Sequence, residues 1–233
     1  MIEGRRERME KDRAAGELKN LKKKVTIVKQ YSYYLENSDE RMQRWTACVQ
    51  EQMNKRFEFL KATLEETCKK NWEEIMESFY LSLSAGVKQT LGFIGARQKE
   101  KVCYIHFSYL LSSAAAGEML LKIDFYDNKY FMDTKDINSY WDYQILFPEY
   151  AADVERLSEQ LYLEVARLAP YELQKAKLYY QACNFMVLEE IIQKLIKTKE
   201  AELCIKKCSE PMVSILFGAY QDQAELIHEL GGV

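Results

Sequence analysis

The chain has 233 residues, of which 48% are apolar and 30% are charged, with only 3 prolines and 9 glycines. This composition excludes disordered, collagen-like and proline-rich proteins. It favours long helices, and the pattern along the chain predicts a predominantly helical α+β fold in a single domain over residues 1–233. Sequences poor in helix breakers form long helices, and no linker of loop composition divides this chain.

The net charge of −3 is distributed unevenly along the chain. Residues 1–30 contain ten lysines and arginines against five acidic residues, a net of +5, so the remainder carries −8. A basic arm on an acidic body is one way to bind nucleic acid, but five acidic residues interrupt the basic run, which favours a solvated helix. DNA binding that depends on salt and disappears on deletion of residues 1–30 would identify the nucleic-acid alternative.

Cysteine usage and hydropathy indicate in which cellular compartment the protein is expected. The six cysteines form no Cys-x-x-Cys pair, and the first residues, MIEGRRERMEKDR, lack the apolar core of a secretion signal. No apolar run approaches the roughly 18 residues of a membrane span. We therefore expect a cytoplasmic protein with reduced thiols, no membrane contact, no metal and no cofactor.

Residues 1–84 are expected to form a long N-terminal antiparallel helical hairpin. In its first arm, apolar residues recur at the a and d positions of about three heptads, and Ser32 occupies the one polar position. Its second arm, from 39 to 84, contains no breaker, and a bend near residues 67–71 is left open. The first arm carries Ala14, Leu18, Leu21, Val25, Val28 and Leu35. The second arm carries Met42, Trp45, Val49, Met53, Phe57, Leu60, Leu64, Cys68, Trp72, Ile75, Phe79 and Leu83.

Three segments follow the hairpin: a connector over 85–100, a sheet over 101–133 and a helical segment over 134–233. Apolar residues alternate in 102–111 and again in 118–126, as is typical of half-buried strands. A turn at Asp127-Asn128 leads into a third strand, which gives a small three-stranded antiparallel meander at about 102–132. Helical periodicity then predicts three C-terminal helices, the last carrying Ile215, Leu216 and Leu226 on its apolar stripe.

The outer face of this meander is the first candidate for chemistry. A register that matches the apolar faces places His106 opposite Lys122 and Tyr104 opposite Asp124, with even-numbered residues facing solvent. Asp124 is then diagonal to His106, an arrangement suited to general-base catalysis. No nucleophile elbow or cofactor motif accompanies these residues, and a solvated face with paired charges explains them equally well.

A second candidate is the pair Cys204 and Cys208, one helical turn apart, where two thiolates can share a zinc ion. A structural zinc site needs four ligands, and only Cys183 and His228 would complete one. Two small buried hydrophobic side chains explain the pair more simply.

The hairpin leads to the main functional expectation. Its first arm is shorter than its second, so either the rest of the chain or a partner must cover the far end of the second arm. Aromatic and aliphatic residues of this kind also anchor protein interfaces. The candidate interaction residues are Leu64, Trp72, Ile75, Phe79, Tyr31 and Tyr34.

The chain carries no complete catalytic or cofactor motif. We therefore expect a non-enzymatic protein-interaction module (an adaptor, regulator, chaperone-like or inhibitor protein) that binds another protein or a second copy of itself through its hairpin and aromatic-rich surface. Two alternatives remain. One is a nucleic-acid-associated regulator that uses the basic N-terminal helix. The other is an enzyme with a site at His106 and Asp124 or at Cys204 and Cys208.

Overall fold

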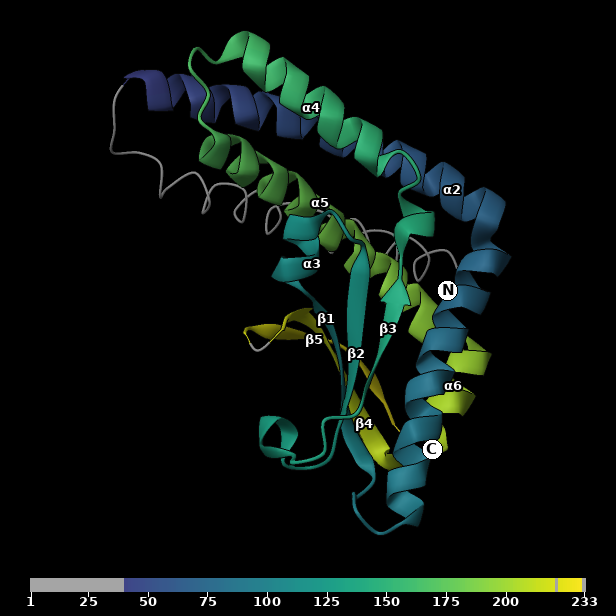
Figure 1. Ribbon diagram of the computed structural model, residues 1–233. Coiled ribbons are helices and arrows are strands. Elements are labelled where there is room, and N and C mark those ends of the chain that lie inside the picture. The colour runs from purple at the N-terminus through teal and green to yellow at the C-terminus, as the bar shows by residue number, and fades with distance from the viewer. Residues whose placement is uncertain (1–39, 221, 232–233) are drawn as a thin grey trace, which may run out of the picture.

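A long bent helix and a five-stranded mixed sheet organise the protein (Figure 1). The computed structural model describes residues 40–220 and 222–231. The first arm of the expected hairpin, with Tyr31 and Tyr34, lies outside these residues. In chain order the elements are α2 (Glu40–Gly95), β1 (Val102–Tyr109), α3 (Leu111–Ala116), β2 (Leu120–Tyr126), η1 (Tyr130–Met132), β3 (Asn138–Asp142), η2 (Gln144–Leu146), α4 (Tyr150–Glu164), α5 (Pro170–Ile196), α6 (Lys199–Lys206), β4 (Ser209–Ala219) and β5 (Ala224–Leu230).

The helix α2 spans 56 residues and bends at Asn71, whose φ of −117° and ψ of 20° leave the helical region. A helix through residues 40–84 is confirmed, and the bend falls in the segment where the sequence left one open. The helix also continues through most of the expected connector, as far as Gly95. All twelve residues of its predicted apolar stripe lie in the core or pack against it.

The predicted three-stranded antiparallel meander is wrong. The sheet has the order β3-β2-β1-β4-β5, with β4 parallel to β1 and every other pair antiparallel. The strands β1 and β2 form as expected, but the partner of β2 on its other side is β3, and residues 130–132 form the single turn η1.

Local hydrogen bonds explain why the expected third strand is a turn. Asp127 accepts a hydrogen bond from the backbone N–H of Lys129 at 2.8 Å, and Asp133 accepts one from Lys135 at 2.9 Å. Aspartate side chains that bind nearby N–H groups stabilise turns at the expense of strands. Tyr130 has a φ of 53°, which no strand residue adopts.

The expected C-terminal three-helix segment is wrong in its last third. The helices α4 and α5 match the two helices predicted after residue 148, but the last predicted helix is replaced by strands β4 and β5. In β4 the buried residues Val213, Ile215 and Phe217 alternate with more exposed ones, the period of a strand. Pairing with β1 buries this strand within the sheet.

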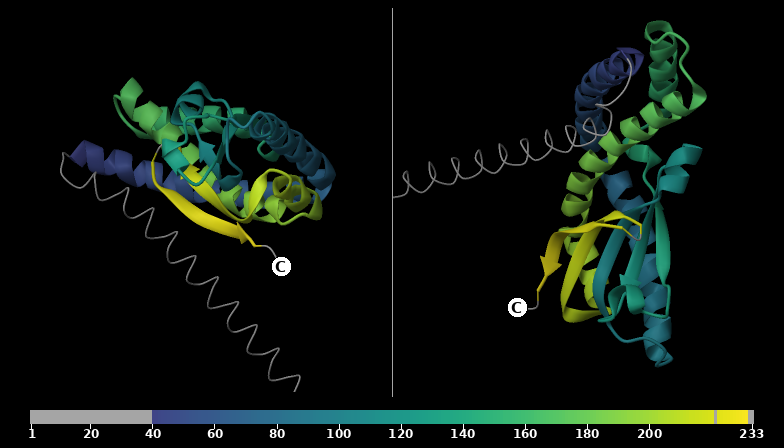
Figure 2. Two further views of the ribbon diagram at one scale, coloured as in Figure 1. Left: turned by 90° about the horizontal axis from the view of Figure 1, so that it is seen from below. Right: turned by 90° about the vertical axis from the view of Figure 1, so that its left-hand side faces the viewer.

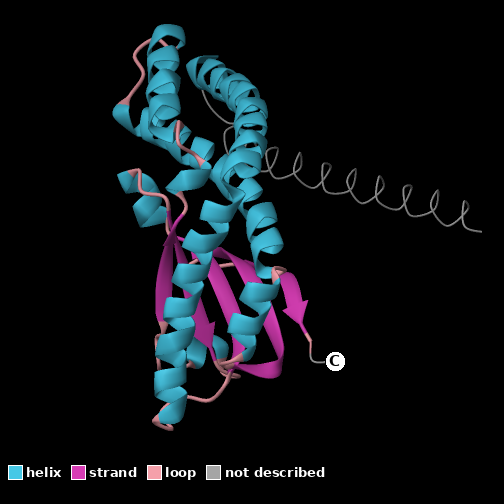
Figure 3. Cartoon of the chain, turned by 90° about the vertical axis from the view of Figure 1, so that its right-hand side faces the viewer, coloured by secondary structure: helices cyan, strands magenta, loops and turns pink. Residues whose placement is uncertain are grey.

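Helices cover one face of the sheet, as the views along it show (Figures 2 and 3). Phe79 of α2 stacks on Phe107 of β1 at a centroid distance of 5.8 Å and meets Trp141 of β3 edge-on at 5.2 Å. Gly86 lets α2 lie unusually close to the strands, because a Cβ there would overlap the ring of Phe125 and the hydroxyl of Ser139.

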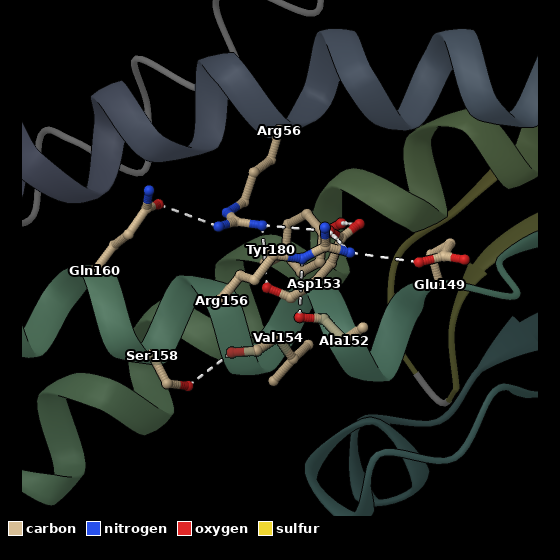
Figure 4. Close-up of polar contacts among 9 residues, drawn as sticks. All are labelled: Arg56, Glu149, Ala152, Asp153, Val154, Arg156, Ser158, Gln160 and Tyr180. Atoms are coloured by element: carbon tan, nitrogen blue, oxygen red, sulfur yellow. Dashed lines mark hydrogen bonds and ion pairs between the residues drawn. The ribbon is translucent and has the colours of Figure 1, made fainter.

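The N-terminal half of α2, α4 and the first half of α5 form a helical arm beyond the end of the sheet (Figure 1). Polar contacts join the three helices (Figure 4). Arg56 of α2 donates to the carbonyl oxygen of Asp153 at 3.0 Å and to Gln160 at 3.1 Å. The hydroxyl of Tyr180 on α5 donates to the Asp153 carboxylate at 3.0 Å. Asp153 therefore links all three helices of the arm.

Candidate functional site

The sheet brings the four residues of the expected catalytic face together, but in a different register. His106 pairs directly with Asp124, and Ser108 rather than His106 lies opposite Lys122. A shift of two residues keeps every side chain on its predicted face. That face is nevertheless buried rather than solvated, because His106, Ser108, Lys122 and Asp124 are each at most 4% exposed.

The loop that contains η1 covers this even-numbered face. The rings of Tyr130 and Phe131 lie 6.4 and 6.2 Å from the ring of His106, and Tyr104 packs against Tyr130 at 5.1 Å. From the turn that follows β4, the ring of Tyr220 lies 4.1 Å from the ammonium group of Lys122. The sequence predicted a strand in place of this loop, so the predicted fold contained no segment that covers this face.

His106 and Asp124 do not form a catalytic dyad. Asp124 accepts a hydrogen bond from Ser108 at 3.1 Å and pairs with the ammonium group of Lys122 at 2.7 Å. Neither ring nitrogen of His106 has a hydrogen-bond partner among the residues described. Burial, assisted by the nearby charge of Lys122, lowers the pKa of His106 to about 4. The imidazole is therefore neutral, not oriented by a carboxylate and closed to solvent, which is the environment of a core residue.

Cys204 and Cys208 are buried, and burial raises the pKa of both thiols, that of Cys208 to about 12. Both are consequently protonated at neutral pH and unsuited to act as nucleophiles. Within the described part of the chain, no three or more histidine, cysteine or acidic side chains cluster as metal ligands would. All six cysteines are unpaired thiols.

The expected interaction residues on α2 lie inside the protein. Leu64, Ile75 and Phe79 are buried, and Trp72 is half-buried against the core. The rest of this chain covers them, which is one of the two outcomes that the sequence left open. In the folded chain, Leu64, Ile75 and Phe79 offer no surface to a partner.

An open apolar groove lies between the N-terminal half of α2, the middle of α5 and the sheet end where β4 turns into β5. Its volume is about 580 Å³. Its apolar lining combines side chains from all three places. These are Trp45, Val49 and Met53 of α2, Tyr179, Ala182, Cys183, Phe185 and Met186 of α5, and Tyr109, Phe217 and Ala224 of the strands.

Aromatic stacking sets the position of α5 against the sheet in this groove. The ring of Tyr109, at the end of β1, stacks on Phe185 at a centroid distance of 4.0 Å and lies 5.9 Å from Phe217. Gly218 allows the β4–β5 turn to close tightly, because a Cβ there would overlap the backbone of Gln223 and Ala224. The sheet end is thus held as one wall of the groove.

Besides its apolar residues, the groove is lined by the polar residues Thr46, Gln50 and Gln223 and by two acidic residues. Of the residues that line it, as far as the structure describes them, the two charged ones are Glu189 and Glu225. Trp45 is 1% exposed, and its indole N–H has no hydrogen-bond acceptor among the described residues. The groove therefore combines a mainly apolar lining with two acidic side chains.

The sequence pointed to only part of this groove. Trp45, Val49 and Met53 were assigned to the apolar stripe of their helix, whereas Phe185 and Met186 were not singled out. One signal was present: residues 178–188 of α5 are apolar on more than one helix face, which indicates that both faces contact protein.

In the part of the chain that the structure describes, no helix has the length and apolarity needed to cross a membrane.

Comparison of this chain with protein-family models, with curated proteins and with solved structures finds no match. The groove and its chemistry are therefore the basis for assigning a function.

Proposed function

We propose that this protein is a non-enzymatic protein-interaction module that binds a basic amphipathic helix of a partner protein in the groove. The observation that carries the proposal is the groove itself. Apolar side chains from α2, α5 and the strand ends line an open cavity of about 580 Å³, and the charged residues described there are both acidic.

The chemistry of the groove favours a helix over a small polar substrate. Sites for small polar ligands place several polar groups around one point, whereas this lining is mainly aliphatic and aromatic. An amphipathic helix inserts side chains at positions i, i+3, i+4 and i+7 into such a groove. Glu189 and Glu225 favour lysine or arginine beside those anchors and repel acidic partners.

The same proposal places the protein in the cytoplasm. Its six cysteines are unpaired, and burial, as the largest cause, raises the pKa of all six thiols. Protonated, unpaired thiols suit a reducing compartment.

A synthetic helix tests the proposal directly. A peptide of about 18 residues, with leucine on one helical face and lysine on the other, spans about five turns. Its affinity for the full chain is measured by fluorescence anisotropy. Ala182→Lys places a positive charge in the α5 wall, and Thr46→Lys does so in the α2 wall. Each should weaken binding about tenfold or more, because an ammonium group is costly to bury against apolar side chains and repels the lysines of the peptide.

Two controls accompany these variants. Gln174→Lys makes the same charge change as Ala182→Lys at an exposed position of α5 outside the groove, and it should leave the affinity unchanged. A peptide of the same composition with its leucines scrambled off the helical face should bind weakly. Equal affinity of the chain for both peptides would refute the proposal. So would equal affinities of the variants Gln174→Lys, Ala182→Lys and Thr46→Lys.

A further inference from the structure

We propose that the groove binds partner helices that carry different apolar anchor residues, because methionines on its two helical walls adapt to the anchor while the rest of the groove keeps its shape. An anchor is the apolar side chain that a partner helix inserts. The inference rests on the proposed function, since it takes the groove to be a site for an amphipathic helix. It assigns the range of accepted partners to Met53 of α2 and Met186 of α5, which both line the groove.

Polar contacts outside the groove fix the spacing of its two helical walls. Arg56, three residues after Met53 on α2, donates to the carbonyl oxygen of Asp153 on α4 at 3.0 Å. The hydroxyl of Tyr180 on α5 donates to the carboxylate of the same Asp153, also at 3.0 Å. Because α4 joins α2 to α5 in this way, the walls keep their distance, and adjustment to a partner falls to the side chains.

The end of the groove that the sheet forms is also rigid. The ring of Tyr109 stacks on Phe185 at a centroid distance of 4.0 Å and an interplanar angle of 11°, and it lies 5.9 Å from Phe217. Phe185 and Phe217 are buried, so the surrounding atoms hold both rings in place. This end offers every partner the same aromatic surface.

Among the apolar side chains described in the groove, the two methionines have the most rotational freedom. Methionine is unbranched, has three rotatable side-chain bonds and fills irregular gaps, and surfaces that bind several partners are often rich in it. Met53 lies on the α2 wall, and the half-buried Met186 lies on the α5 wall. One helical turn before each of them stand Val49, which is β-branched and stiff, and Ala182, which has no rotamers.

Four helical peptides test this inference on the full chain. They share the leucine and lysine faces of the peptide described above, and the central leucine is either kept or replaced by methionine, isoleucine or phenylalanine. A pocket of fixed shape discriminates about tenfold or more between side chains that differ by one methylene group. The adaptable groove should instead bind all four peptides within about threefold of one another, as measured by fluorescence anisotropy.

Stiffer walls should create discrimination. In the double variant Met53→Ile, Met186→Ile, β-branched side chains of nearly the same volume replace the flexible ones. Its affinities for the four peptides should spread over about tenfold or more, and Met186→Ile alone should widen the range in the same direction. Met76→Ile is the control, because Met76 lies on α2 and packs against the core outside the groove. This control should bind all four peptides as the wild type does.

The outcomes separate this inference from the proposed function. If the wild type binds the peptides but discriminates among them by about tenfold, the groove is a helix site of fixed shape and the inference is wrong. If Met186→Ile and the double variant keep the narrow range of the wild type, the methionines do not set that range, and the inference is again wrong. If no peptide binds the wild type, the proposed function is wrong and the inference fails with it.

Discussion

His106 is a buried imidazole that the fold keeps uncharged. It shares the even-numbered face of the sheet with Lys122 and Asp124, whose ion pair measures 2.7 Å, and the loop around η1 excludes water from all three. Breaking a buried ion pair of this kind strongly destabilises a protein, although the intact pair contributes little net stability. A neutral imidazole without hydrogen-bond partners is likewise a cost to stability rather than a catalytic asset.

The pH dependence of stability should report this environment. The unfolded chain binds a proton at His106 near pH 6.5, whereas the folded chain does so only near the pKa of about 4. Between these values the unfolded state binds more protons, so stability falls as the pH is lowered. His106 should therefore remove about 2 kcal/mol from the free energy of unfolding between pH 7 and pH 5.

Urea denaturation of the wild type and of His106→Phe at both pH values measures this contribution, because other titrating groups affect the two proteins alike. His228→Gln serves as a comparison, since burial lowers the pKa of His228 at a partly exposed position. If acidification lowers the stability of the wild type and of His106→Phe by the same amount, His106 is not a neutral, buried residue.

At the scale of elements, the two halves of the long helix α2 have different roles. Before Asn71 it belongs to the helical arm and lines the groove, and after Asn71 it packs on the sheet. Close packing in the second part depends on Gly86, where a side chain would meet Phe125 of β2 and Ser139 of β3. The helix contains two further glycines, Gly92 and Gly95, and neither has a heavy atom within 4 Å of the position that a Cβ would take.

Two alanine substitutions in α2 should act in opposite directions. Gly86→Ala should destabilise the protein by about 1–3 kcal/mol, because its Cβ overpacks a core with no free space. Gly92→Ala should stabilise it by up to about 1 kcal/mol, because Gly92 is exposed, has nothing within reach of a Cβ and gains helix propensity. Urea denaturation gives both values. A stabilised Gly86→Ala variant would show that the helix does not approach the sheet as described.

At the scale of the whole molecule, the C-terminal strands join distant parts of the chain. The strand β4 lies parallel to β1 in the interior of the sheet, while β5 forms its edge and supplies one end of the groove. The connection from β1 to β4 passes through β2, β3 and the helices α4, α5 and α6, so the sheet is complete only when the last residues have folded. Non-local pairing of this kind slows folding, because the long intervening chain must first close into a loop.

Ile215 and Leu226 distinguish this arrangement from the helix that the sequence predicted, which turned both residues inward. Ile215 is fully buried in β4, whereas Leu226 is 55% exposed on β5. Ile215→Asp should therefore abolish cooperative thermal unfolding, because an unpaired charge would be buried, and Leu226→Asp should leave the melting transition nearly unchanged. Circular dichroism melts measure both, and equal effects would restore the helical interpretation.

The sequence by itself determined the elements whose signal is local. The spacing of apolar residues over 42–83 is enough to predict α2, because that spacing depends only on helix geometry. The alternation of apolar residues in β1 and β2 likewise depends only on the pleat of a strand. The antiparallel pairing of β1 with β2 and the face of each side chain followed from the same patterns. The predicted register differs from the observed one by two residues, because a shift of two leaves every side chain on the same face.

Only the tertiary structure decided the rest. The segment that holds β4 and β5 carries apolar residues at spacings that fit either a helix or a strand, and the choice depends on whether β1 has an unpaired edge to accept β4. The burial of His106 depends on a loop whose aspartates favour a turn over a strand. The groove depends on Trp45, Phe185 and Phe217, residues distant in sequence that meet only when the arm packs against the end of the sheet. Contacts of this kind are properties of the packed chain, since no local pattern specifies which surfaces meet.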